Sequence, residues 1–334
     1  MKRIVLVSFL FFAGVAMAQS DLEDLLLAGI DDAEQFTTDY LAPATEGIIY
    51  GVSGSWYNTA EAKPLGGFEI SIIGNMAFFG NKEDKKQFIL NTADYENLQF
   101  VDGSTSKPVS TALGDIEGVE VFVEDETGLA REEFELPTGL ASENIDFIPS
   151  GYIQVSVGLI KGTEIKARFL PKIKADELEL SFYGFGLQHE FTKHLPADKI
   201  LPVAISAVIG YTHFDGNYDL SASDIIDGSN QRLEMDINSW LFQAVASTRL
   251  PVINFYGGLG YLTGKSKSDA LGTYIVESGP IQASYTDPFS IVEDTNGVVG
   301  NIGAKLKLGF FRLHADYSFG GFNNLSVGIN FGFR

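Results

Sequence analysis

The chain has no cysteine, and only four histidines and two tryptophans occur among its 334 residues. Without cysteine there is no disulfide framework, no cysteine metal site and no thiol for lipid attachment after export. The histidines, His189, His194, His213 and His314, show no spacing typical of a metal site, so we expect no metal and no cofactor. Catalytic motifs are also missing, and we predict that the protein is not an enzyme.

Basic residues are scarce. Lysine and arginine number 23 against 44 aspartates and glutamates, which gives a formal net charge of −21. Binding to the phosphates of nucleic acids needs a basic surface. The composition therefore excludes nucleic acid as a partner.

Long hydrophobic runs are absent except near the N-terminus. Lys2 and Arg3 precede a short apolar run over residues 4–15, and Ala16-Met17-Ala18 resembles a cleavage site. The run is too short for a membrane-spanning helix. We predict a signal peptide over residues 1–18 and an exported chain of charge 21 − 44 = −23; an N-terminal anchor is the alternative. The rest of the chain spans a membrane as strands or not at all.

The last forty residues, 295–334, alternate strictly between apolar and polar side chains, which predicts strands. The phase reverses between Phe310 and Phe311, as a two-residue hairpin turn would produce. These strands have about 9–12 residues, near the length that a tilted strand needs to cross a bilayer. We expect the bulky apolar face to point outward and the charged, glycine-rich face to point inward.

Alternation also marks several segments between residues 152 and 261. The connections at 161–162, 192–200, 249–251 and 309–311 lie on one side, and on average they are the shorter set. Short periplasmic turns and longer external loops are typical of transmembrane barrels. We predict an all-β fold, a transmembrane antiparallel β-barrel of about twelve strands, with ten to fourteen left open. It covers residues 47–334, with long external loops at 80–150 and 264–296. A soluble, secreted β-sandwich is the alternative fold.

Residues 19–46 form an acidic N-terminal segment in which 20–41 is predicted to be helical. Ser20 and Glu23 have the spacing of a capping box, and Pro43 marks the predicted end. The polar face of this helix carries acids, among them Asp31, Asp32 and Glu34.

Basic side chains gather on the inward face of the last strands. These are Lys305, Lys307, Arg312 and Arg334, and the last three lie at the periplasmic end. Our hypothesis is that the N-terminal helix enters the lumen as a plug, with Asp31, Asp32 or Glu34 near this basic patch. In the alternative, the lumen charges pair across adjacent strands, such as Arg312 with Asp316.

Several stretches resemble known proteins: the signal peptide, the acidic helix, 54–59 (GSWYNT), 67–71 (GFEIS) and 158–171 (GLIKGTEIKARFLP). Over nearly the whole mature chain they resemble uncharacterised outer-membrane barrel proteins of the Bacteroidetes type. The layout, a plug segment followed by a barrel, resembles that of the FadL-like long-chain fatty-acid transporters. That resemblance implies uptake of hydrophobic molecules, although no ligand-binding residue of that family can be matched here.

These observations predict a porin-like protein of the Gram-negative outer membrane. It would pass or bind small hydrophobic or amphipathic molecules by diffusion through a plugged lumen. The alternative is a structural or interaction barrel that docks a periplasmic or surface partner through its loops. Expected partners are outer-membrane lipid and a small hydrophobic ligand; the sequence identifies no protein partner.

Overall fold

The computed structural model describes residues 24–124, 131–175, 177–196, 201–220, 227–278 and 281–333. The predicted signal peptide, the capping pair Ser20 and Glu23, and Arg334 lie outside these residues. Within these ranges, no helix is both long and apolar enough to cross a membrane.

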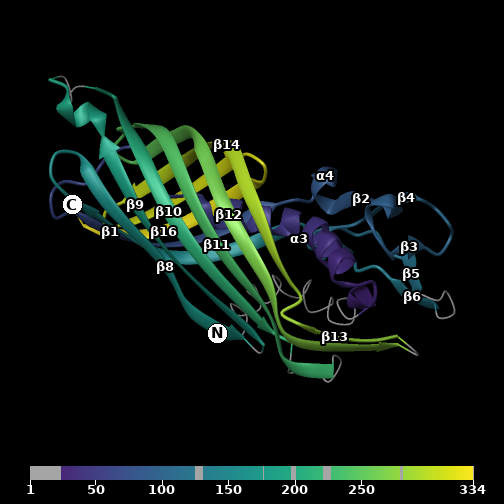
Figure 1. The fold of residues 1–334 in the computed structure, drawn as a ribbon. Coiled ribbons are helices and arrows are strands. Elements are labelled where there is room, and N and C mark those ends of the chain that lie inside the picture. Colours follow the sequence, from purple (N-terminus) through teal and green to yellow (C-terminus); the bar gives the residue numbers. More distant parts are fainter. Residues whose placement is uncertain are drawn as a thin grey trace.

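Ten strands form a closed antiparallel barrel (Figure 1). Each strand pairs with its neighbour in the sequence of barrel strands, and the last strand pairs with the first. In barrel order they are β1 (Phe68–Phe78), β7 (Phe147–Gly158), β8 (Thr163–Ala175), β9 (Leu178–Glu190), β10 (Val203–Asp219), β11 (Asp227–Thr248), β12 (Ile253–Ser278), β14 (Phe289–Leu308), β15 (Phe311–Phe319) and β16 (Asn323–Phe333). The predicted fold class is confirmed, with a strand number at the lower end of the expected range.

Residues 79–146, between β1 and β7, form an accessory subdomain at one end of the barrel (Figure 1). Its strands have only two to five residues and pair with one another, in a β2–β4 pair and a β3–β5–β6 sheet. The predicted external loop at 80–150 is therefore largely a folded subdomain, and its short strands add none to the barrel. Its elements are α4 (Glu83–Lys86), β2 (Gln87–Asn91), η1 (Thr92–Asp94), β3 (Gln99–Phe100), β4 (Ser106–Ser110), β5 (Glu120–Glu124), β6 (Arg131–Glu135) and η2 (Leu140–Glu143).

The second predicted long loop, 264–296, is largely strand. β12 and β14 stay paired from Ile253↔Leu306 to Ala270↔Phe289. Beyond that point β12 pairs with β13 (Ile281–Thr286), which lies outside the closed barrel. The prediction failed because polar residues predominate in this stretch, although apolar side chains such as Tyr274, Val276 and Ile291 are buried on its strands.

The outer face of the barrel is apolar, as predicted, and the inner face carries buried polar and charged side chains together with apolar ones such as Phe214 and Leu241. On β1, Phe68 and Ile72 are 43% and 54% exposed, whereas the intervening Glu69 is 1% exposed. On β16, Phe331 is exposed and Asn330 is fully buried. Such a surface suits contact with lipid rather than water.

Four connections lie together at one end of the barrel, here called the short-turn end. They join β7 to β8, β9 to β10 through η3 (Phe191–His194), β11 to β12, and β14 to β15. On average they are shorter than those at the other end, where β8–β9 (176–177) and β15–β16 (320–322) are also joined by short connections. The predicted two-residue turn is confirmed: Leu308 pairs with Phe311, and Gly309 adopts φ = 73°. The opposite end, with the accessory subdomain, is called the long-connection end.

Ile329 of β16 tests the lipid-facing surface. It is 40% exposed and pairs with Ile72 and Leu313. We expect Ile329→Arg to destabilise the barrel in lipid vesicles by about 2–4 kcal/mol, because a charge would enter the hydrocarbon region. Denaturant unfolding followed by heat-dependent gel mobility measures the change. The matched control is Ile89→Arg in the accessory subdomain, where Ile89 is 63% exposed and the effect should stay within about 0.5 kcal/mol. Equal effects at both positions would contradict a lipid-facing wall.

Candidate functional site

Helix α3 (Ile30–Ser53) enters the barrel from the long-connection end (Figure 1). The Tyr50 ring packs 6.1 Å from the ring of Phe322, in the connection between β15 and β16. The helix ends inside the barrel, where the Ser53 hydroxyl lies 2.7 Å from that of Ser239. The predicted helix end near Pro43 is wrong: Pro43 lacks only its own amide donor, and contacts with the barrel hold the helix beyond it.

Arg168 of β8 holds the C-terminal end of α3. Its Nη1 donates to the carbonyls of Val52 and Gly54 at 2.9 and 3.0 Å. The guanidinium lies 3.5 Å from the centre of the Trp56 ring and 4.4 Å from that of Tyr152. A cation at a helix C-terminus complements the helix dipole. This side chain is 1% exposed, so its positive charge is compensated by carbonyls and aromatic faces.

Residues 54–67, here called the lumen segment, run from the end of α3 to the start of β1 at the short-turn end. The predicted barrel boundary at residue 47 therefore moves to Phe68. Side chains of the segment bond directly to the inner wall: Ser55 Oγ donates to Asp316 at 3.1 Å, and Asn58 Nδ2 donates to Glu69 at 2.9 Å. Ala60 donates its amide to Ser247 Oγ at 2.9 Å.

Trp56 fits a hollow that glycines leave in the wall. A Cβ atom at Gly210 would lie 2.2 Å from the indole nitrogen, and one at Gly186 would lie 2.7 Å from ring carbons. Trp56 itself is fully buried. The glycines on the inward face of β9 and β10 thus make room for this one side chain.

Three of the predicted basic residues, Lys305, Lys307 and Arg312, face the lumen near the short-turn end and pair with two acids. Lys305 Nζ lies 3.0 Å from Glu69, and Arg312 Nη1 lies 2.6 Å from the same carboxylate. Lys307 Nζ lies 3.3 Å from Glu61 of the lumen segment. The alternative pairing of Arg312 with Asp316 is not what the structure has, since Asp316 accepts hydrogen bonds from Ser55 and Tyr256.

The acids of the N-terminal helix lie at the other end of the molecule. Asp32 accepts hydrogen bonds from the backbone amides of Glu96, Asn97 and Leu98 at 2.7 to 3.0 Å and so joins α3 to the accessory subdomain. Asp31 is exposed and Glu34 is half-buried on the same turns of α3. The hypothesis that these acids meet the basic patch is wrong, because the chain enters from the long-connection end. The lumen segment supplies Glu61 instead.

The barrel wall opens between β7 and β8. Their pairing ends at Ile153↔Phe169. Beyond it, the rest of β7 pairs with β1 alone, and β8 pairs with β9 after a register shift between Leu170 and Ile173. Pro171 lies at this shift and cannot donate a ladder hydrogen bond. The sequence predicts the end of a strand at Pro171, whereas the strand continues to Ala175 and the proline marks the opening.

A cavity of about 440 Å³, here called the wall pocket, occupies this opening. Its inner side is formed by α3, and its outer side includes lipid-facing residues such as Ile72 and Phe169. Lining side chains are almost all apolar; the main contributors are Ile48, Val52, Ile72, Tyr152, Phe169 and Phe182. Sequence reasoning missed this site because its residues come from six different elements: α3, β1, β7, β8, β9 and β10.

These features define the class: a transmembrane β-barrel whose lumen is filled by its own N-terminal chain. The chain belongs to a family of unknown function, DUF6588, whose model matches residues 1–333. No curated protein matches the sequence significantly.

Among solved structures, the chain is similar to outer-membrane barrels. For the attachment invasion locus protein Ail of Yersinia pestis, identity is 9%, coverage is 80% of this chain and 99% of that one, and the TM-score is 0.28. For the translocator domain of the autotransporter NalP from Neisseria meningitidis, identity is 10%, coverage is 80% of this chain and 88% of that one, and the TM-score is 0.31. For a FadL homologue of Pseudomonas aeruginosa, identity is 10%, coverage is 80% of this chain and 89% of that one, and the TM-score is 0.21. Likenesses this distant transfer no property to this chain, and the Bacteroidetes-type resemblance stays a prediction.

Gly210 tests how Trp56 anchors the lumen segment. We expect Gly210→Val to displace the indole and to raise single-channel conductance in planar bilayers, because the new side chain needs the space that Trp56 fills. The matched control is Gly74→Val, since a Cβ at Gly74 meets nothing within 4 Å. A Gly210→Val protein that folds and conducts like the wild type would contradict this anchoring.

Glu69 tests the buried charge network. Removing one partner of a buried ion pair leaves the others uncompensated and costs about 3–5 kcal/mol, so Glu69→Gln should lower the free energy of unfolding strongly. Its control is Glu83→Gln, because Glu83 is 72% exposed and pairs with Lys86 at the surface, where a pair contributes about 0–1 kcal/mol. Denaturant titration measures the free energy of unfolding of both variants. An equally small loss of stability in both would show that water compensates the charges in the lumen.

Proposed function

We propose that this protein is an outer-membrane barrel that binds a small hydrophobic or amphipathic molecule in the wall pocket, with entry from the surrounding lipid. The observation that carries the proposal is an apolar cavity which opens in the barrel wall beside lipid-facing side chains and ends against α3. Its volume lies within the range of about 300–1,000 Å³ that is usual for small-molecule sites.

The chemistry of the pocket favours a mainly apolar ligand. Among its polar side chains, Ser150 already donates to the Gly51 carbonyl and the Tyr152 hydroxyl donates to the Gly54 carbonyl. No lysine, arginine, aspartate or glutamate is among the described lining residues. A charged ligand head would remain unpaired inside, so it would stay at the mouth of the pocket while the apolar part enters.

Passage beyond the pocket needs a change in the lumen. The lumen segment bonds to the wall along its length, from Ser55 to Lys63, which donates to Glu164 at 3.1 Å. Binding is therefore the primary function that we propose, and transport would follow displacement of this segment.

A second candidate function is an interaction barrel. The accessory subdomain and the projecting hairpin of β12 and β13 lie at the long-connection end, which faces outside the cell if the short turns are periplasmic. This arrangement would present folded structure to a partner, and it is compatible with an occupied wall pocket.

Gly151 tests the proposed binding site. It lines the pocket, and a Cβ there meets only the Ile73 carbonyl, at 3.5 Å. We expect Gly151→Phe to weaken binding of a fluorescent long-chain fatty acid by more than about tenfold, or about 1.4 kcal/mol, because the ring fills the cavity. The measurement is a fluorescence titration in mild detergent.

The control for this titration is Gly300→Phe on β14, where a Cβ makes only ordinary contacts at 3.6 Å and beyond. Equal binding by both variants and the wild type would reject the wall pocket as the site. Absence of binding in the wild type, together with no apolar molecule extracted from the purified protein, would favour the interaction barrel.

A further inference from the structure

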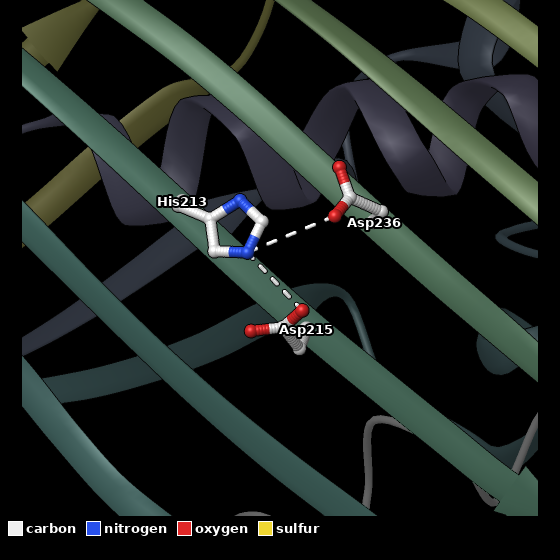
Figure 2. A group of neighbouring side chains, drawn as sticks. All are labelled: His213, Asp215 and Asp236. Carbon is white, nitrogen blue, oxygen red and sulfur yellow. Dashed lines mark hydrogen bonds and ion pairs between the residues drawn. The ribbon is translucent and has the colours of Figure 1, made fainter.

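Three side chains with metal-binding atoms meet on the outer surface of the barrel. His213 and Asp215 lie on β10, and Asp236 lies on the adjacent β11 (Figure 2). The register pairs Asp215 with Asp236 directly, and His213 with Asn238. The group lies next to the Tyr211 and Trp240 rings, where the apolar outer surface gives way to polar side chains.

Neighbouring groups determine the tautomer of His213. The Asn238 amide nitrogen donates to Asp236, so its oxygen points toward His213 and Tyr211. That oxygen accepts from the Tyr211 hydroxyl at 2.6 Å and lies 3.0 Å from His213 Nδ1. An amide oxygen is only an acceptor, and therefore Nδ1 carries the proton. Metal-binding histidines are usually oriented in this way by a hydrogen bond from the nitrogen that does not bind the metal.

The other ring nitrogen, Nε2, faces the two carboxylates. It lies 3.1 Å from Asp215 Oδ1 and 3.7 Å from Asp236 Oδ2. Among the described residues, the only ion pairs that Asp215 and Asp236 make are with His213; Lys267, opposite Asp236 in the register, pairs with Asp269 instead. A lone pair on Nε2 opposite two negative oxygens is unfavourable, so either a second proton on the ring or a metal ion must lie between Nε2 and the carboxylates.

The spacing suits one ion. All three ligand atoms lie within 4.8 Å of one another. Bonds of about 2.0–2.2 Å from one zinc ion to nitrogen and oxygen place its ligand atoms within about 4.4 Å of each other. The side chains of Asp215 and Asp236 are 53% and 48% exposed, so small rotations close the difference.

We propose that His213, Asp215 and Asp236 form a binding site for a divalent transition-metal ion of the zinc type. An imidazole nitrogen with two carboxylates is a ligand set for such ions rather than for calcium, which prefers oxygen ligands alone. The site lies on the outer face of β10 and β11, whereas Phe214, between His213 and Asp215, lines the wall pocket from the inner face of β10.

Zinc titration by calorimetry tests this proposal on the full chain in detergent, with metal removed beforehand. The wild type should bind one zinc ion per chain at this site, and His213→Gln and Asp236→Asn should each weaken that binding at least tenfold. The matched control is His194→Gln, because His194 and His189 form the other histidine cluster, with Nε2 atoms 3.1 Å apart. This control should keep the wild-type affinity at the proposed site.

Folding of each variant is verified by heat-dependent gel mobility. Wild-type zinc affinity in His213→Gln would overturn the proposal, and so would an absence of zinc binding in the wild type, which would mean that a second proton on His213 compensates the carboxylates. Calcium binding as tight as zinc binding would also overturn it, because the imidazole would then contribute nothing.

Discussion

The polar interior of the barrel is the constraint on which the rest of the structure depends. A wall that turns its apolar side chains to lipid must turn its polar side chains inward, where they need partners. The lumen segment supplies many of them. Asn58 donates a hydrogen bond to Glu69, and Glu61 forms an ion pair with Lys307. The Trp56 ring stacks on the Arg168 guanidinium, which donates to the backbone carbonyl of Val52 at the end of α3. In the interior of this barrel, an extended segment supplies partners to buried polar side chains, and apolar side chains such as Phe214 and Leu241 pack in the same interior.

The path of the chain also fixes the lumen segment at both of its ends. Helix α3 enters at the long-connection end, and β1 begins at the short-turn end, so the lumen segment has to cross the barrel (Figure 1). It is tied at both ends, by α3 and the accessory subdomain at one and by β1 at the other. Because α3 also forms the inner side of the wall pocket, whatever occupies that pocket touches the element that continues into the lumen segment.

Much of the barrel could be predicted from local patterns, and the failures are instructive. Alternation predicted the wall, its two faces and the turn at Gly309 correctly. Pro43 and Pro171 misled, because tertiary packing decides whether a helix or strand ends at a proline. Here α3 continues past Pro43 and β8 continues past Pro171. Residues 264–296 misled for a different reason: polar residues predominate there, and the buried apolar side chains, such as Tyr274 and Ile291, do not form a clear alternation. Lys305, Lys307 and Arg312 were expected inside and lie there, but their partners Glu61 and Glu69 were not foreseen, since the expected partners lay on the helix.

By itself, the sequence determined that this chain forms a barrel with an apolar exterior and charged side chains inside, because the pleat of a strand makes side-chain direction a local property. Only the tertiary structure decided which segment fills the lumen, where the wall opens and which residues meet across strands. His213 and Asp236, or Trp56 and Gly210, come together through the register and closure of the whole barrel. Those depend on pairings between distant strands, which no local pattern encodes.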